Sequence, residues 1–257
     1  MEHIIPMLVP GPVTKELLQC LRDIAYDEQN LRYGEYSDGI ITGCNLVEEN
    51  MTIGLVSGMV KFGGRIYKLN KKTLIPYEPT DELTILKLRF NPQIASRDYI
   101  HYKAELILDT DAYIKPHEME MGRFKLKRGS RLRTEYKDFW DMTTEYDTVN
   151  LIHIKQAAPI KATLTSNITR LFGLEAYPCI SGNALDAAFC TQALGSGGGV
   201  NRILIEQYVC NRLGQTYNGT MDNERLYTAL GEVLSLITGR AGVEKGHGHG
   251  DGILLLN

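Results

Sequence analysis

A run of basic side chains followed by aromatic ones is the first feature of the sequence that could do chemistry. The basic residues are Arg123, Lys125, Lys127, Arg128, Arg131 and Arg133, and the aromatic ones are Tyr136, Phe139 and Trp140. Cations pair with phosphates and aromatic rings stack on bases, so this mixture is typical of nucleic-acid binding. Acidic residues from Glu135 to Asp147 follow at once and neutralise the local charge. We therefore expect an exposed cationic strand face, or one that meets an acidic protein partner, and no nucleic-acid binding.

Carboxylates and imidazoles gather just upstream of that run. They are His101, Asp109, Asp111, His117, Glu118 and Glu120. Glycosidases use paired carboxylates about 5 to 10 Å apart, and carboxylates with imidazoles bind divalent metals. Proximity in the sequence does not place two carboxylates face to face, so loop carboxylates are the simpler interpretation. A hydrolase is kept as one alternative function.

Two histidines near the end of the sequence could bind a metal. His247 and His249 lie in a glycine-rich run, and in an extended segment both imidazoles would point the same way. One chain offers too few ligands, but three chains around a threefold axis would bring together enough nitrogens for an octahedral transition metal. A metal at this pair in a trimer is therefore a hypothesis, and a mobile glycine-rich tail is the alternative.

Neither the cysteines nor the longest glycine run forms a catalytic motif. The cysteines are Cys20, Cys44, Cys179, Cys190 and Cys210; they contain no Cys-x-x-Cys pair and most lie in apolar runs. We expect reduced core thiols. Cys179 is the alternative nucleophile, but its neighbours Pro178 and Ile180 give it no basic partner. The run Gly195 to Gly199 lacks the Lys-Ser/Thr of a phosphate-binding loop and favours a linker.

The predicted secondary structure that positions these residues begins with a helix and continues with strands. An amphipathic helix is predicted over residues 13–30, with leucines and Ile24 at helical spacing. Short strands of an antiparallel meander are predicted over 39–41, 51–56, 59–62, 65–69 and 73–76. Longer strands are predicted over 81–90 and 99–108, a hairpin with one cationic face over 122–133, and a last strand over 148–154.

Helix formers dominate after residue 158. Helices are predicted over 160–172, 183–194, 200–213 and 223–238. Ser181 and Asp222 are expected to cap helix N-termini, and Gly214 and Gly239 to end helices. The sequence thus predicts an α+β fold: an N-terminal helical segment over 1–30, an antiparallel, sandwich-like β-rich domain over 31–157, a small helical domain over 158–244, and a Gly/His-rich tail over 245–257.

Charge and hydropathy exclude several classes of function. The 28 basic and 31 acidic residues give a formal net charge of -3, which creates no overall field for a polyanion or an acidic membrane. The apolar runs are too short to span a bilayer, and Met1 to Pro10 lacks the basic start of a signal peptide. We expect synthesis in the cytosol and no membrane insertion.

One stretch of the β-rich part resembles a known class of proteins. Residues 38–44 read Asp-Gly-Ile-Ile-Thr-Gly-Cys, and residues 58–67 carry the pattern G-x-V-x-x-G-G-R-I-Y. Over residues 30–155, the sequence resembles tail-fibre and baseplate proteins of prophages and phage-tail-like bacteriocins from Gram-positive hosts. The resemblance implies an adaptor that joins baseplate and fibre, made in the host cytoplasm and carried in a virion or tail-like particle. It supplies no catalytic residues.

The resemblance also implies function through contacts between subunits. We expect partners among other tail or baseplate subunits, a homo-oligomer with a trimer favoured, and contact with a tail fibre or host receptor. Exposed aromatic and apolar residues would carry these contacts. The candidates are Tyr136, Phe139, Trp140, Leu254, Leu255 and Leu256. A carbohydrate- or receptor-binding module, with sugars stacked on Tyr99, Tyr102 or Trp140, is the leading alternative function.

Overall fold

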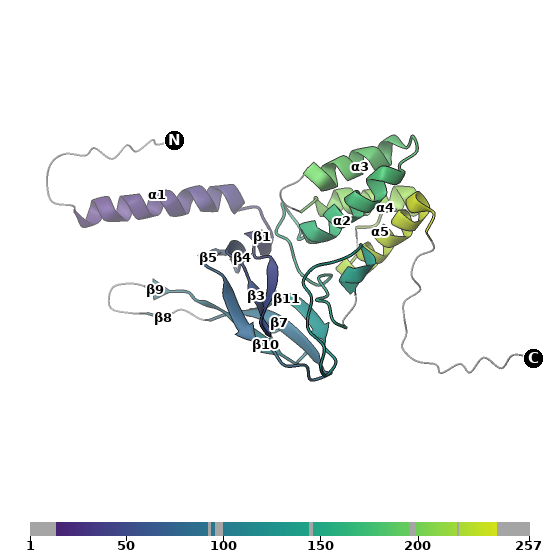
Figure 1. The fold of residues 1–257 in the computed structure, drawn as a ribbon. Coiled ribbons are helices and arrows are strands. Elements are labelled where there is room, and N and C mark those ends of the chain that lie inside the picture. Colours follow the sequence, from purple (N-terminus) through teal and green to yellow (C-terminus); the bar gives the residue numbers. More distant parts are fainter. Residues whose placement is uncertain are drawn as a thin grey trace, which may run out of the picture.

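The computed structural model describes residues 14–91, 94–95, 100–143, 146–195, 199–219 and 221–240 of the chain. Within these residues, five α-helices and three small antiparallel sheets confirm the predicted α+β class. The sheets lie in the first half of the sequence and the bundle of helices in the second (Figure 1). None of the described helices is long and apolar enough to cross a membrane.

The first helix, α1 (Lys15–Tyr33), extends away from the helical bundle (Figure 1). Its C-terminal end contacts one buried lysine, Lys61, of strand β4 (Gly58–Phe62). The Nζ of Lys61 donates hydrogen bonds to the carbonyl oxygens of Tyr33, Gly34 and Tyr36 at 2.7, 2.9 and 2.6 Å. An ammonium group at this position complements the negative end of the helix dipole. It also satisfies carbonyls that a helix end leaves without partners.

Two of the sheets come from the predicted meander. One has the order β1 (Gly39–Gly43), β4 (Gly58–Phe62), β5 (Arg65–Leu69), and the other has the order β2 (Leu46–Glu49), β3 (Thr52–Leu55), β6 (Thr73–Pro76). Gly63 and Gly64 join β4 to β5 with φ angles of 56° and 72°. Both positions require left-handed backbone, which glycine adopts without strain, so this pair forms a tight two-residue turn.

The third sheet contains the longer strands. Its order is β10 (Ala104–Asp109), β7 (Leu83–Phe90), β11 (Glu118–Lys125), with β7 in the middle. Two short strands, β8 (Ile94–Ala95) and β9 (Ile100–His101), pair with each other. The central strand is buried along most of its length, including Lys87. The predicted strands over 81–90 and 99–108 are therefore present, the second one in two pieces.

Two strand predictions are wrong. The cationic hairpin expected over 122–133 does not form, because β11 begins earlier, at Glu118, and pairs with β7 instead of folding back on itself. Residues 126–133 continue as a loop with a turn at Arg128 and Gly129. The last strand expected over 148–154 is reduced to isolated bridges, among them Asn150 to Arg123 and Thr148 to Arg133.

The helical part contains α2 (Ser166–Ala176), α3 (Ala184–Gly195), α4 (Arg202–Leu213) and α5 (Asn223–Thr238), with short 3-10 turns over Trp140–Thr143 and Tyr177–Cys179. The bounds predicted for α5 are confirmed, with Asp222 as its N-cap and Gly239 as its left-handed C-cap. Gly214 ends α4 as predicted. The first helix of the group starts later than residue 160, because Thr163 pairs with Gln156 in extended backbone. Asn183, and not Ser181, accepts the first backbone hydrogen bonds of α3.

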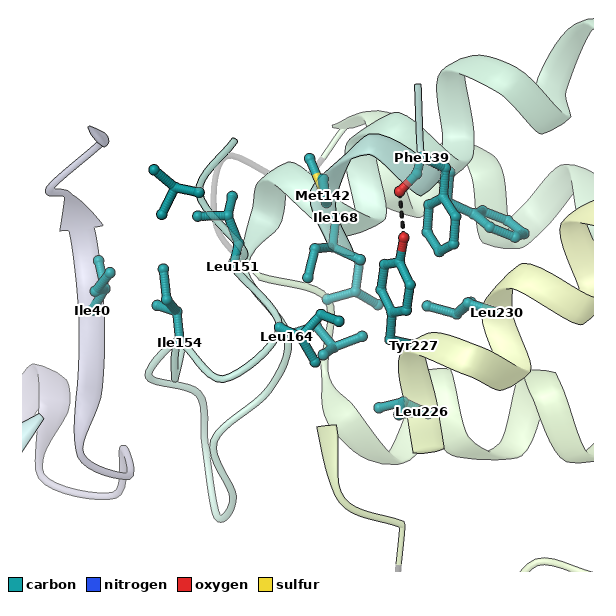
Figure 2. Packing of buried hydrophobic residues seen from close by; sticks show 14 of the residues in the cluster. Ile40, Phe139, Met142, Leu151, Ile154, Leu164, Ile168, Leu226, Tyr227 and Leu230 are labelled. Carbon is teal, nitrogen blue, oxygen red and sulfur yellow. Dashed lines mark hydrogen bonds between the residues drawn. The ribbon is translucent and has the colours of Figure 1, made fainter. Parts of the chain in front are cut away.

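A single apolar core runs from the sheets into the helices (Figure 2). Phe139 belongs to this core, with none of its surface exposed. Its ring stacks on Tyr227 of α5 with centroids 4.5 Å apart, and the Tyr227 hydroxyl donates a hydrogen bond to the Phe139 carbonyl. Figure 2 shows this contact beside Met142, Ile168 and Leu230. The segment after β11 therefore joins the two halves of the protein.

The close contact between Trp140 and Gly231 gives a test of this packing. A Cβ atom at Gly231 would overlap the indole ring of Trp140. Replacing a glycine by alanine inside a helix normally stabilises it by about 0.5 to 1 kcal/mol. Here we expect Gly231→Ala to lower the free energy of unfolding by about 1 to 3 kcal/mol, because the core is overpacked. Urea unfolding measures the change. Thr228 is exposed on the same helix, so Thr228→Ala is the control and should change the free energy of unfolding by less than about 0.5 kcal/mol. A Gly231→Ala variant that is more stable than the natural protein would contradict the described packing.

Candidate interaction surfaces

The basic residues after β10 are mostly paired with carboxylates or aromatic rings. Arg123 contacts Glu120 at 2.7 Å, and Arg133 contacts Asp141 at 3.0 Å. Arg131, on the loop, contacts Glu48 of β2 at 3.0 Å. The ammonium groups of Lys125 and Lys127 lie 5.5 and 4.9 Å from the ring centroid of Tyr146. The structure thus disperses these cations among separate partners, and no continuous cationic strand face forms within the described residues.

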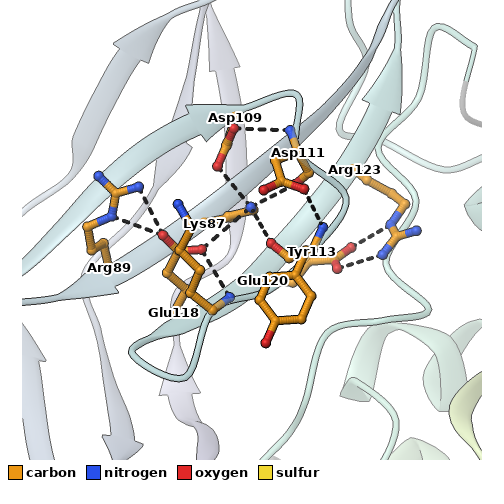
Figure 3. A network of polar contacts seen from close by, with 9 residues as sticks. Lys87, Arg89, Asp109, Asp111, Tyr113, Glu118, Glu120 and Arg123 are labelled. Carbon is orange, nitrogen blue, oxygen red and sulfur yellow. Dashed lines mark hydrogen bonds and ion pairs between the residues drawn. The ribbon is translucent and has the colours of Figure 1, made fainter.

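The acidic residues considered for catalysis surround Lys87 instead of a cavity (Figure 3). The Lys87 side chain is fully buried, and its Nζ lies 3.0 Å from Asp109 and 3.5 Å from Glu118. It also donates hydrogen bonds to the carbonyl oxygens of Asp111 and Tyr113, at 2.8 and 2.9 Å. The polar contacts that a buried ammonium needs are therefore supplied by the end of β10, by the loop that follows it and by β11.

Two of these carboxyls are held in the ionised form. The pKa of Asp109 is lowered by a hydrogen bond from the Asp111 amide and by Lys87. Burial by itself raises the pKa of Glu118, but hydrogen bonds from Arg89 and from the Lys115 amide, together with the charges of Lys87 and Arg89, lower it overall. Neither group is suited to act as a general acid near neutral pH, because such an acid needs a raised pKa. Among the described residues, no group of three or more His, Cys, Asp or Glu side chains could hold a metal ion.

Among the aromatic residues expected at a partner surface, Phe139 is buried, and Tyr136 and Trp140 are half-buried and pack against the apolar core. Phe139 is fully buried, and Trp140 packs edge-on against Tyr227 at 6.4 Å. The Tyr136 hydroxyl donates to the Val149 carbonyl at 2.8 Å, and burial raises the Tyr136 pKa. These rings stabilise the junction between sheets and helices.

The remaining predicted residues lie in different places. Tyr102 is covered by the Arg65 guanidinium, 4.2 Å from its ring centroid, while Tyr99 is outside the described residues. Cys44, Cys190 and Cys210 are buried, and Cys179 is exposed. Burial raises the pKa of Cys44 and that of Cys190 to about 11, so neither is a thiolate near neutral pH. His247, His249, Leu254, Leu255, Leu256 and most of the glycine run from Gly195 to Gly199 lie outside the described residues.

One side of α1 exposes apolar residues that sequence reasoning did not select as a contact site. Leu18, Leu21, Ile24 and Leu31 are 59%, 49%, 43% and 87% exposed. On a helix with 3.6 residues per turn they fall within one stripe, which we call the apolar face of α1. The helical spacing of the leucines already marked the helix as amphipathic. What the sequence did not reveal is that the helix stands apart from the core.

A groove of about 890 Å³ lies at the junction of the sheets and the helices. Strand β1, the segment Cys44–Leu46 and helix α2 contribute to its walls, and Arg170 is the one charged residue among its described lining residues. The Thr165 hydroxyl, buried beside it, has no hydrogen-bond partner in the described structure. The groove therefore holds no carboxylate, imidazole or lysine that could serve as a general acid or base for a nucleophile.

The buried ammonium of Lys87 should be essential for stability. We expect Lys87→Met to lower the free energy of unfolding by about 3 to 5 kcal/mol, because it leaves the two carboxylates without their buried cation. Chemical denaturation followed by circular dichroism measures this. Lys103 pairs with Glu105 in an exposed position, so Lys103→Met is the matched control and should cost less than about 1 kcal/mol. Equal effects of the two substitutions would contradict the structural role of Lys87.

The lowered pKa values predict how stability depends on pH. In the unfolded chain, Asp109 and Glu118 bind protons at about pH 4, but in the folded chain they bind them at lower pH. Their ion pairs therefore stabilise the fold above that pH, and this stabilisation is lost as the pH falls through the folded pKa values. We expect the unfolding free energy to decrease between about pH 5 and pH 3, and to decrease less steeply in Glu118→Gln. If the unfolding free energies of the natural protein and of Glu118→Gln fell equally steeply with pH, Glu118 would not contribute to this pH dependence.

Comparison with known proteins finds similarity to solved structures alone. No described protein family matches the chain, and no curated protein matches its sequence. A crystal structure of TssK is similar with a TM-score of 0.37 and 10% sequence identity, over 95% of this chain and 70% of that chain. A chain in the TssK-TssF-TssG baseplate subcomplex of the type VI secretion system, determined by cryo-electron microscopy, is similar with a TM-score of 0.41 and 10% identity, over 93% of this chain and 100% of that chain.

Proposed function

We propose that this protein is a structural component of a phage-type tail or baseplate, an adaptor that joins baseplate and fibre through contacts with other subunits. It would be made in the host cytoplasm and carried in a virion or tail-like particle. The resemblance of residues 38–67 to tail-fibre and baseplate proteins supports this class of assembly.

The apolar face of α1 is the observation that carries the proposal. Burial of one leucine or isoleucine contributes about 1.5 to 3 kcal/mol, so a helix with four such residues exposed favours association with another surface. Apolar patches of this kind mark contact sites in soluble proteins. The C-terminal end of the helix is anchored to β4 by Lys61, which attaches this apolar face to the sheet.

The placement of the reactive side chains supports a structural role over the two alternatives. The carboxylates suggested for a hydrolase hold Lys87 and Arg89 in place. Trp140, suggested as a sugar platform, contacts Phe139 and Tyr227. In each case a side chain that could act on a ligand contributes to the framework of the fold.

Particles from cells that encode this chain provide the test. An antibody against the chain should label one end of the tails in electron micrographs, and deletion of the gene should remove complete tails. In the deletion strain, a gene carrying Leu21→Asp and Ile24→Asp should restore few or no tails, because charges replace the apolar face of α1.

The control carries the same charges on the opposite side of α1. Gln19→Asp with Asn30→Asp changes two exposed polar positions and should restore tails fully. Thermal unfolding of each purified variant checks that the fold is intact. Complete, unlabelled tails from cells without the gene would exclude the proposed function.

A further inference from the structure

Leu21, Ile24 and Leu31 of the apolar face of α1 belong to a sequence pattern with the spacing of a coiled-coil seam. Leu17, Leu21, Ile24, Glu28 and Leu31 follow one another at intervals of 4, 3, 4 and 3 residues. This is the heptad spacing of a and d positions, with Leu17, Ile24 and Leu31 at d and with Leu21 and Glu28 at a. Leu18 and Ala25 fall at the adjacent e positions and widen the stripe. A stripe of this kind is complementary to another copy of itself.

The charges beside the seam fit a parallel arrangement. In this register Asp27 is at position g and Arg32 is at position e, five residues later. In parallel coiled coils a g residue faces the e residue of the next heptad on the partner helix. Asp27 of one copy would therefore meet Arg32 of the other, and the reciprocal pair forms as well. Both side chains are exposed in the structure, so they are accessible to a second helix.

The attachment of α1 determines where each pairing direction would place the rest of the two copies. Its C-terminal end is held at β4 by Lys61, while the rest of the helix extends away from the bundle of α2 to α5 (Figure 1). With 19 residues, α1 is about 28 Å long. A parallel pair would bring the sheets of two copies to the same end of the coiled coil, whereas an antiparallel pair would separate them by the length of the helix.

We propose that α1 forms a parallel, in-register coiled coil with α1 of a second copy of this chain, with Asp27 and Arg32 paired between copies. The inference rests on the proposed function, since it names the partner that covers the apolar face. Glu28 places like charges opposite each other in the seam. A polar residue at an a position lowers stability and specifies register. The coiled coil is also short, so the association is weaker than that of a long zipper.

A charge exchange in the full-length protein tests the pairing. Sedimentation equilibrium should show a homo-oligomer for the natural sequence. Asp27→Arg or Arg32→Asp alone should weaken association by about fivefold to tenfold, because each places like charges opposite one another. The double variant, which exchanges the two charges, should restore most of the affinity. Glu28→Leu should strengthen association, because it removes the repulsion in the seam.

Crosslinking tests the direction. In a background with Cys20→Ser and Cys179→Ser, Leu31→Cys should form a disulfide between copies under copper-catalysed air oxidation, because in-register d positions are adjacent. In an antiparallel pair, Leu31 would lie near the N-terminal end of the other helix, far from the second Leu31, and no such disulfide would form. Asn30→Cys, on the polar side of the helix, is the matched control and should remain monomeric on a nonreducing gel.

The outcomes separate this inference from the proposed function. A monomeric natural protein, or single and double charge variants that associate equally well, would overturn the coiled coil. If Leu21→Asp with Ile24→Asp still abolished tails in that case, the structural role would stand with a different subunit covering α1. Conversely, a parallel oligomer in cells whose tails form without the protein would retain the coiled coil and exclude the tail function.

Discussion

Burial of Phe139 against Tyr227 is the contact on which the arrangement of this protein depends. The sheets and the helical bundle are far apart in the sequence, and the segment carrying Phe139 lies between them in the chain and in space. Because apolar burial is the dominant favourable term in folding, a shared core makes the two halves fold as one body. The groove lined by β1 and α2 lies along this union.

Charged residues inside the body serve the same purpose as the apolar ones. Lys87 is enclosed by two carboxylates and two carbonyl oxygens, and Arg202 by Glu206, Asn223 and the carbonyl groups of Ala162 and Met221. A buried cation is tolerated only when its donors are satisfied, and each of these cations connects segments distant in sequence. Residues of types that often carry out catalysis thus fix loops and helix ends in this fold.

The predictable part of the structure is the part that local chemistry determines. The alternation of Leu86, Leu88 and Phe90 indicated a strand, and Asp222 with Gly239 marked the ends of α5. The cationic hairpin failed because β11 selects β7, a strand more than 30 residues earlier, and no local turn signal reports such pairing. For the same reason the sequence could not show that Arg131 meets Glu48 or that Phe139 is buried. The apolar spacing of α1 was visible, but its exposure depends on where the core of the rest of the chain lies.

The lysine at the base of α1 has a mechanical consequence. One ammonium group connects three carbonyl oxygens at the end of the helix to β4, the middle strand of its sheet. Tension applied along α1 therefore reaches the sheet at two strands, at β1 through the backbone that follows the helix and at β4 through Lys61. Because β1 and β4 are paired with each other and β4 also pairs with β5, the load is shared across the whole sheet. The helix is thus attached to the sheet in a way that resists mechanical detachment.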